Sequence, residues 1–218
     1  MTVIVPVTTL SPLDYDAALF DLDGVLTRTA SVHAAAWKAL FDGFLEKRAA
    51  SAAMPFIPFD VDADYLKYVD GKPRQNGVMA FLESRGIELL LGAPDDGPNV
   101  QSVHELGKLK DRYFLQYLEK NGVEPYEAAI ELVRTLQAQN VKTAVVSSSR
   151  NCAAVLEAAG IARLFDTRVD GKDLAGLELK GEPAPDVFLE AARRLRAEPS
   201  CSIVFEDVIA GVQAGLAG

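Results

Sequence analysis

One stretch, Ala18-Leu-Phe-Asp-Leu-Asp-Gly-Val-Leu-Thr27, decides the fold of this chain. In this stretch a short apolar run leads two aspartates, Asp21 and Asp23, into a turn that contains glycine. Side chains alternate between the two faces of a strand, so these two carboxylates share a face. Carboxylates at the end of a buried strand are costly without a cation, and Mg²⁺ prefers oxygen ligands of this kind. The stretch therefore predicts a strand that ends in a metal site, where Asp21 can also act as a nucleophile.

Two simpler interpretations of the stretch compete with this one. A calcium-binding loop requires oxygen ligands at its positions 1, 3 and 5 and a glutamate at position 12. Counted from Asp21, position 5 is Val25 and position 12 is Val32, so a calcium loop is excluded. An Asp-Gly turn between two strands remains an alternative for the stretch taken alone.

The composition limits the classes of function. The chain has 218 residues, of which 49% are hydrophobic, which is enough for one α/β core with an inserted subdomain or for two small domains. A net charge of −9 argues against nucleic acids and membrane surfaces as partners. The two cysteines form no disulfide framework and indicate reduced thiols, so we expect a cytoplasmic protein. We also expect a monomer. Residues 1–10 are apolar but are interrupted by Pro6 and do not resemble a signal peptide.

The periodicity of apolar residues changes along the chain. Up to residue 120 it predicts helices after the first strand, at 31–48, 64–70, 76–85 and 100–120, with an ordered loop at 49–62. Beyond Gly122 it predicts helices at 126–140 and 185–196, a helix ending at 159, and strands at 141–146, 165–169 and 202–205. Alternating strands and helices indicate a parallel sheet covered on both faces. We therefore expect an α/β core formed by residues 1–28 and 121–218, with an all-helical insertion at 29–120.

Three of the predicted strands end in polar clusters. The clusters are Asp21 with Asp23, the serine run that begins at Ser147, and Glu206 with Asp207. In open parallel sheets the ligand lies at the carboxyl ends of the strands, so the three clusters should meet there. Asp21 would attack phosphorus and Asp23 would exchange a proton with the leaving or attacking oxygen. Asp207 and Glu206 would complete the metal site, and the hydroxyl and backbone N–H of Ser147 would bind the phosphoryl oxygens. Each cluster alone is also typical of a helix cap or a polar surface, but the three together predict phosphoryl transfer.

Residues 17–218 resemble the haloacid dehalogenase-like superfamily of phosphatases and phosphomutases. The resemblance rests on Asp-Leu-Asp-Gly-Val (21–25), Val-Val-Ser-Ser-Ser-Arg-Asn (145–151), Phe-Glu-Asp (205–207) and, imperfectly, Gly-Glu-Pro-Ala-Pro-Asp (181–186). It implies a Rossmann-like core with a mobile helical cap at residues 29–120, and Mg²⁺ as cofactor.

The same resemblance implies roles for single residues. Asp21 would be the nucleophile and Asp23 the acid/base, which would also offer its backbone carbonyl to the metal. The metal ligands would be Asp21, Asp23, Asp207 and Glu206, and the phosphate-binding residues Ser147, Ser148, Arg150, Asn151 and Lys180.

A narrower resemblance, to the β-phosphoglucomutase subfamily, rests on residues 21–37. Thr29, His33 and Trp37 lie four apart and share one face of the first inserted helix. In that subfamily such residues face the active site; the simpler alternative is a buried helix face. Arg74 resembles the cap arginine that holds the far phosphate of a sugar bisphosphate, and otherwise is a solvated loop residue. Lys110 resembles a cap lysine near the site, with Lys108 as a rival.

One residue departs from the superfamily pattern. Glu182 stands where a lysine normally precedes the first proline of the third motif. Two unit charges about 5 Å apart interact by roughly 3 kcal/mol at an effective dielectric constant near 20, so this exchange can cost several powers of ten in rate. We hypothesise that Lys180 partly substitutes, with Arg150 as another candidate; the alternatives are a much-weakened enzyme or a Glu182 that faces away.

The end of the sequence also departs from the pattern of the family. The chain ends at Gly218, soon after a helix predicted to begin near Ala210, whereas the family continues with one more strand and helix. We therefore expect a core whose C-terminal part is truncated and whose stability is reduced.

Three functions fit these features. The first is a Mg²⁺-dependent phosphomutase that converts β-glucose 1-phosphate into glucose 6-phosphate through an aspartyl-phosphate on Asp21. The second is a phosphatase for sugar phosphates, including a disaccharide phosphate of the trehalose-phosphate type, which would admit water to the same intermediate. The third, suggested by Glu182, is a catalytically weakened protein that binds phosphosugars or a partner. We expect the mutase, with a small sugar phosphate as its partner.

Overall fold

The computed structural model describes residues 14–218 except residues 71, 96, 98 and 99. The chain divides into two compact units. The first joins the N-terminal segment through Arg28 to Val123–Gly218, and the second comprises Thr29–Gly122. Residues 1–10, which the sequence predicts not to be a signal peptide, lie outside the described residues. Among the described helices, none is long and apolar enough to cross a membrane.

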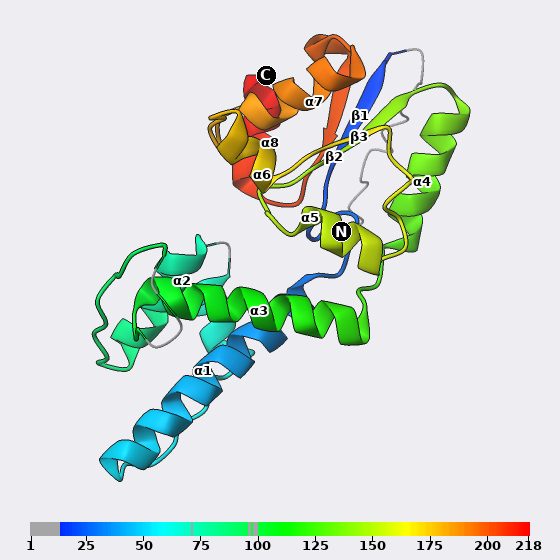
Figure 1. Ribbon diagram of the computed structural model, residues 1–218. Coiled ribbons are helices and arrows are strands. Elements are labelled where there is room, and N and C mark those ends of the chain that lie inside the picture. Colours follow the sequence, from blue (N-terminus) through cyan, green and yellow to red (C-terminus); the bar gives the residue numbers. More distant parts are fainter. Residues whose placement is uncertain (1–13, 71, 96, 98–99) are drawn as a thin grey trace, which may run out of the picture. The chain divides into compact units, whose positions relative to one another are not determined.

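The first unit is built on a parallel sheet (Figure 1). Its strands are β1 (Ala17–Asp21), β2 (Lys142–Val146), β3 (Thr167–Val169) and β4 (Ser202–Phe205), in the order β3-β2-β1-β4. Every pair of neighbouring strands is parallel. The predicted α/β fold with a parallel sheet is therefore confirmed.

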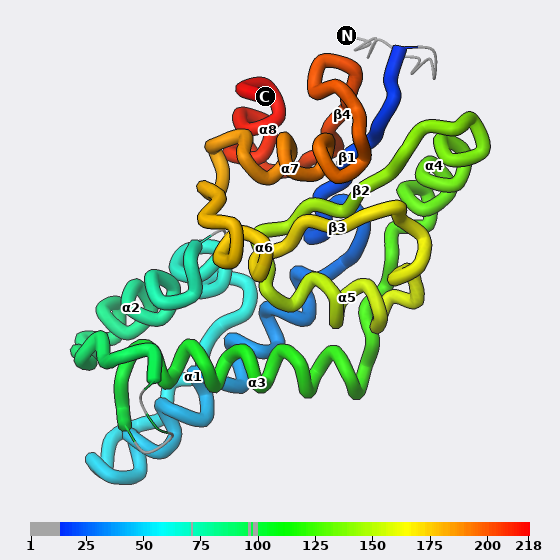
Figure 2. Tube along the Cα trace, turned by 45° about the horizontal axis from the view of Figure 1, so that its top comes forward, coloured from blue at the N-terminus to red at the C-terminus, as the bar shows by residue number. Residues whose placement is uncertain are grey.

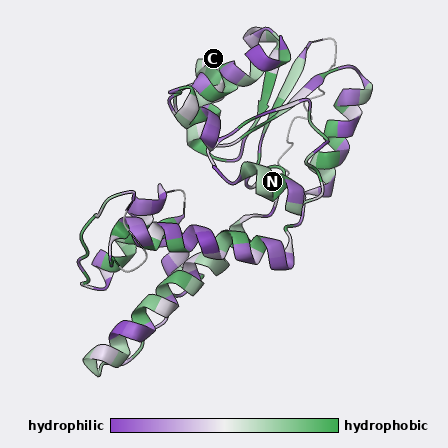
Figure 3. Ribbon diagram, in the orientation of Figure 1, coloured by the Kyte–Doolittle hydropathy of each residue, from purple (hydrophilic) through white to green (hydrophobic). Residues whose placement is uncertain are grey.

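The central strand β1 is apolar because the sheet buries both of its faces. Residues 17–20 are each at most 1% exposed, and Figure 3 shows β4 and most of β1 in the green of hydrophobic residues. On one face of the sheet Leu19 and Val146 pack with Phe188 of the covering helix. On β1, Phe20 stacks on Phe205 of β4 with ring centroids 4.5 Å apart. This packing fixes where the strand ends, and hence where Asp21 lies.

Helices cover both faces of this sheet. They are α4 (Glu127–Ala138), α5 (Cys152–Ala158), α6 (Gly171–Gly176), α7 (Asp186–Leu195) and α8 (Ile209–Ala217), with a 3₁₀ turn at Pro199–Cys201. Figures 1 and 2 both show α7 and α8 on one side of the sheet and α4 on the other. Strands joined by helices on both faces are the doubly covered arrangement that the sequence predicts.

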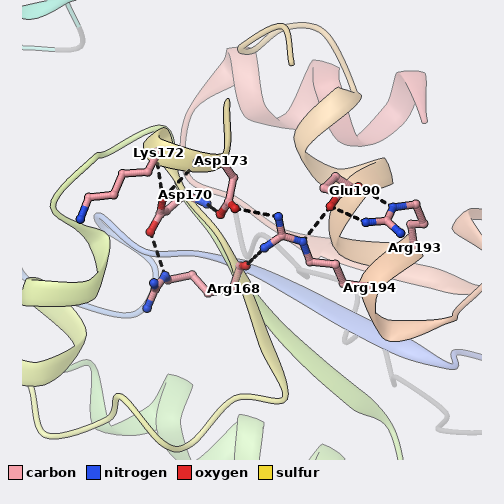
Figure 4. A network of polar contacts seen from close by, with 7 residues as sticks. All are labelled: Arg168, Asp170, Lys172, Asp173, Glu190, Arg193 and Arg194. Carbon is pink, nitrogen blue, oxygen red and sulfur yellow. Dashed lines mark hydrogen bonds and ion pairs between the residues drawn. The ribbon is translucent and has the colours of Figure 1, made fainter. Parts of the chain in front are cut away.

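A network of ion pairs ties β3, α6 and α7 together (Figure 4). Asp170 accepts from Arg168 Nε at 2.9 Å and forms a capping box at the start of α6 with Asp173. Arg194 of α7 bridges Asp173 and Glu190, both at 2.7 Å. The periodicity did not predict α6, since six residues are too few to show a helical pattern. Its capping box, with acidic residues at 170 and 173, is the signal that could have found it.

Replacing Asp170 with alanine should lower the free energy of unfolding by about 2 kcal/mol, because both the helix cap and the partner of Arg168 are lost. Asp170→Asn keeps a cap acceptor and removes the charge, so it should cost less. Urea denaturation followed by circular dichroism measures both variants. A loss below about 0.5 kcal/mol in Asp170→Ala would show that the network is not important for stability.

In the second unit, all regular elements in the described residues are helices, apart from an isolated bridge between Leu90 and Ser102. They are α1 (Ala30–Ala52), a short π-helix (Tyr65–Val69), α2 (Arg74–Ser84) and α3 (Val103–Asn121). Its core is aromatic: Phe41 lies 4.0 Å from Phe81 and 5.2 Å from Trp37 between ring centroids.

The loop predicted at 49–62 begins later than expected. Helix α1 continues to Ala52 and ends where Ala53 adopts the left-handed conformation. The prediction was wrong at this end because the alanine-rich run 49–53 favours a helix, and the helix stops only near Pro55, since a proline disfavours helical geometry in the residue before it.

Candidate active site

The carboxyl ends of β1 and β4 bring three acidic side chains together. The parallel register pairs Phe20 with Phe205, so Asp21, which ends β1, and Glu206, which follows β4, lie next to each other at this edge. Oxygen atoms of Asp21, Glu206 and Asp207 all lie within 4.8 Å of one another. This cluster joins two of the three polar groups that the sequence predicts at strand ends.

The turn after β1 leaves room for this cluster. Gly24 has a φ of +93°, and a Cβ at this position would overlap the carboxylate of Asp207. The turn is closed by hydrogen bonds from Gly24 N to Thr27 O and from Thr27 N to Leu22 O, each of 2.9 Å. Glycine is required at position 24 both for the positive φ and for the close approach of Asp207. The same turn also contains Asp23, which directly precedes Gly24 and is half-buried.

The acidic cluster repels additional negative charge. Burial, followed by the charges of Asp23 and Glu206, raises the pKa of Asp21 to about 9. The pKa of Glu206 is raised to about 7, first by burial and then by the charge of Glu182. Carboxylates crowded together in this way are the oxygen donors that hard divalent cations prefer. The residues present therefore fit a Mg²⁺ ion.

Glu182 interacts electrostatically with two members of this cluster, Asp21 and Glu206. The residue is half-buried, and burial raises the pKa of its own carboxyl group. Its charge also raises the pKa values of Asp21 and Glu206, so its carboxylate lies within electrostatic reach of both. This interaction argues against the alternative in which Glu182 faces away.

The candidate substitutes for the missing lysine are both exposed. Lys180 and Arg150 have exposed side chains, and the backbone N–H of Lys180 donates to Asp186 at 3.0 Å. Among the described residues, the side chains that shift the pKa of Asp21 are all carboxylates. Neither Lys180 nor Arg150 therefore offsets the charge of Glu182 at Asp21 in the described part of the chain.

The serine run after β2 forms a tight turn. The hydroxyl oxygen of Ser147 accepts from Ser149 N at 3.1 Å, and Ser149 in turn accepts from Asn151 N at 3.1 Å. The backbone N–H of Ser147 donates to Val169 O at 3.0 Å. The expectation that this N–H binds phosphate was therefore wrong, because the N–H continues the hydrogen bonding between β2 and β3. The hydroxyl of Ser147 keeps its hydrogen for a ligand.

Helix α6 packs closely against this turn. A Cβ on Gly171 would overlap backbone atoms of Ser148 and Arg150, so the glycine lets α6 approach the serine run closely. Ser148 is exposed, Asn151 is half-buried, and α5 begins directly afterwards at Cys152. Burial raises the pKa of the Cys152 thiol, which is therefore not a reactive thiolate.

The helical unit holds a second group of predicted site residues. Lys110 Nζ lies 2.7 Å from His33 Nδ1, and the His33 ring stacks on Phe114 with centroids 4.5 Å apart. The same ammonium group lies 5.3 Å from the centroid of Trp37. Burial, then the charges of Lys110 and Arg74, lowers the pKa of His33 to about 3. His33 is therefore neutral, accepts at Nδ1 and carries its proton on Nε2.

The two candidate lysines differ in their surroundings. Lys110 is buried against His33, whereas Lys108 is more exposed and pairs with Glu105 at 3.7 Å. Arg74 begins α2 and pairs with Asp111 at 3.1 Å, so it is not simply a solvated loop residue. Asp111, which directly follows Lys110, was not among the predicted site residues.

Thr29, the first residue of the helical unit, is buried. Its carbonyl oxygen accepts from His33 N at 2.9 Å. Its hydroxyl oxygen has no hydrogen-bond partner within the described chain. Thr29, His33 and Trp37 thus lie at the start of α1 as the sequence predicts, with Thr29 and Trp37 both buried.

Comparisons with known proteins fit these features. The family model of haloacid dehalogenase-like hydrolases matches residues 15–218. A β-phosphoglucomutase of Mycobacterium tuberculosis is 46% identical over 202 residues, which are 93% of this chain and 77% of the relative. A phosphorylated carbohydrates phosphatase of Thermotoga maritima is 28% identical, over 91% of this chain and 79% of the relative. The crystal structure of a β-phosphoglucomutase from Clostridium difficile matches with a TM-score of 0.64 and 25% identity, over 93% of this chain and 81% of that one.

The chain belongs to the haloacid dehalogenase-like hydrolase family, because the family model matches nearly its whole length. Within this family it is similar to β-phosphoglucomutases, at up to 46% identity among the relatives given above. The resemblance that the sequence motifs indicate is therefore confirmed.

Proposed function

We propose that this chain is a Mg²⁺-dependent enzyme that transfers a phosphoryl group between the C1 and C6 oxygens of a β-hexose phosphate, as a β-phosphoglucomutase does. The observation that carries the proposal is the acidic cluster of Asp21, Glu206 and Asp207 at the carboxyl edge of the sheet. The 46% identity to a β-phosphoglucomutase supports the choice of reaction.

In this proposal a carboxylate oxygen of Asp21 attacks phosphorus while the bond to the sugar oxygen breaks. Asp23 gives a proton to that leaving oxygen, and later takes one from the hydroxyl group that attacks the aspartyl-phosphate. Asp21, Glu206, Asp207 and the backbone carbonyl of Asp23 would hold Mg²⁺, which when bound would supply positive charge for the phosphoryl oxygens. The hydroxyl of Ser147 donates to one of these oxygens, and Ser148 and Asn151 extend the phosphate-binding turn.

We propose that the helical unit is the cap, close to the predicted range 29–120, and binds the sugar. A mutase must hold either end of the sugar and exclude water during the lifetime of the aspartyl-phosphate. The neutral His33 offers Nε2–H as a donor, and Lys110 and Arg74 supply positive charge. Arg74 would exchange Asp111 for the far phosphate group of the bisphosphate.

Phosphorus NMR tests the reaction. The protein receives Mg²⁺, β-glucose 1-phosphate and a trace of the 1,6-bisphosphate. Growth of glucose 6-phosphate without inorganic phosphate establishes the mutase. Growth of inorganic phosphate instead establishes a sugar phosphatase, the second candidate, which the similarity to the Thermotoga maritima phosphatase favours. Absence of both contradicts the proposal and favours a binding function.

The gain in stability that Mg²⁺ gives should depend on pH, and the pKa of Asp21 determines whether it grows or shrinks as the pH rises. Its pKa is about 9 in the folded metal-free protein and 3.8 ordinarily, so between these values folding takes up a proton. The stability of the metal-free protein should therefore fall as pH rises, and Glu206 acts in the same direction. We expect a lower melting temperature in EDTA at pH 8 than at pH 6, and a larger gain from Mg²⁺ at pH 8. Equal gains at both values would contradict the site.

We keep the proposal that Lys180 partly replaces the missing lysine. Because Lys180 is exposed, it would have to move toward the phosphoryl group when substrate binds. Lys180→Ala should then lower kcat by a factor between about three and ten, whereas Lys172→Ala, which removes another exposed lysine, should not lower it. An unchanged kcat in Lys180→Ala would refute this role.

We further propose that the enzyme is a cytoplasmic monomer. Its two cysteines, Cys152 and Cys201, are not joined in a disulfide. Light scattering coupled to size-exclusion chromatography tests the oligomeric state.

A further inference from the structure

The acidic cluster and its neighbours gather more carboxyl groups than one divalent cation neutralises when all of them are ionised. Asp21, Glu206 and Asp207 contribute three carboxyl groups within 4.8 Å of one another. Asp23 and Glu182 lie near enough to act on Asp21 electrostatically. The transferred phosphoryl group would bring further negative charge to the same place.

Glu182 differs from the other members of this group in its position. Asp21 ends β1 and Glu206 directly follows β4, whereas Glu182 precedes α7 in the segment that follows α6. Its half-buried carboxylate acts on the cluster from this separate segment. A change at position 182 therefore alters the charge of the site without removing a residue from the strand ends.

We propose that Glu182 makes phosphate binding at this site depend on prior binding of the divalent cation, and strengthens binding of that cation to the phosphate-free protein. The inference rests on the proposed function and concerns the order in which its two charged ligands bind.

The physical reason is the opposite sign of the two ligands. The carboxylate of Glu182 attracts a cation and repels a phosphate group at the same distance. Its half-burial weakens the screening by salt, so both effects persist at physiological ionic strength. In the described part of the chain, the charged side chains that act on Asp21 are carboxylates, which repel a phosphate group when no cation is bound. A bound cation lowers the net negative charge enough for the anion to enter.

Calorimetric titration with MgCl₂ measures the first effect. The proteins compared are the natural chain, Glu182→Gln, Glu182→Lys and the control Glu198→Gln. Glu198 is exposed and precedes β4, so it lies at the opposite end of the sheet from the cluster. Glu182→Gln should bind Mg²⁺ about tenfold more weakly than the natural chain, and Glu182→Lys more weakly still. Glu198→Gln should bind as the natural chain does.

Phosphorus NMR of inorganic phosphate measures the second effect. In EDTA the natural chain should leave the phosphate signal unchanged, whereas Mg²⁺ should broaden or shift it. Glu182→Lys should bind phosphate in EDTA as well. Circular dichroism confirms that the variants are folded, which we expect because each removes a repelling charge.

The inference is overturned if Glu182→Gln binds Mg²⁺ as tightly as the natural chain, if the natural chain binds no Mg²⁺, or if it binds phosphate equally well in EDTA. These measurements need no turnover, so they separate the two proposals. Sugar phosphate turnover with an unchanged Mg²⁺ affinity in Glu182→Gln would refute the inference alone. The expected affinities without any turnover would refute the proposed function alone.

Discussion

Asp21→Asn should reduce phosphoryl transfer from sugar phosphates by at least about 10³-fold, because the amide cannot form the aspartyl-phosphate. The carboxylate is also part of the acidic cluster, so the variant should bind Mg²⁺ more weakly. The metal-free variant should nevertheless be more stable than the natural chain at pH 8, since an amide does not have to take up a proton when the chain folds. Rate loss together with this gain in stability distinguishes a nucleophile from a residue that only supports the fold.

Asp16→Asn is the matched control for this variant. Asp16 is exposed and lies just before β1, at the other end of the same strand. The control should retain the activity of the natural chain. If Asp21→Asn retains more than about a tenth of that activity, Asp21 is not the nucleophile.

Glu182→Lys should raise kcat/KM by about 10²-fold or more. The change replaces a repelling charge with an attracting one near Asp21, and each unit charge at about 5 Å contributes roughly 3 kcal/mol at an effective dielectric constant of 20. Because Glu182 is only half-buried, solvent reduces this effect, and we expect about half of the sum. About 1.4 kcal/mol corresponds to a factor of ten in rate.

Two further variants show whether position matters as well as charge. Glu182→Gln should be intermediate, because it removes the repulsion without adding an attraction. Glu198→Lys makes the same charge change at the far end of the sheet and should leave kcat/KM unchanged. A Glu182→Lys rate no higher than that of Glu182→Gln would mean that a lysine at this position does not reach the phosphoryl group.

The sequence predicts those parts of the structure that depend on neighbouring residues. The apolar run before Asp21, the alternation of strands and helices, and the polar residues at strand ends are all local patterns. Since parallel strands align their carboxyl ends, local patterns suffice to bring Asp21 and Asp207 to one edge of the sheet.

The remaining features depend on packing between distant segments. Lys110 contacts His33 across 77 residues of sequence, and only the packing of α1 on α3 brings Lys110, rather than Lys108, to His33. The pairing of Arg74 with Asp111 has the same origin. The orientation of Glu182 was also open, because it lies in a loop, where no periodicity predicts the direction of a side chain.

The aromatic core of the helical unit also gives the chain a natural optical reporter. Trp37 is the only tryptophan in the sequence, and it is 4% exposed between Phe41 and the ammonium group of Lys110. Its fluorescence therefore monitors residues 29–122 alone, whereas circular dichroism monitors both units. If the two signals are lost at different urea concentrations, the helical unit and the sheet unfold as separate cooperative segments.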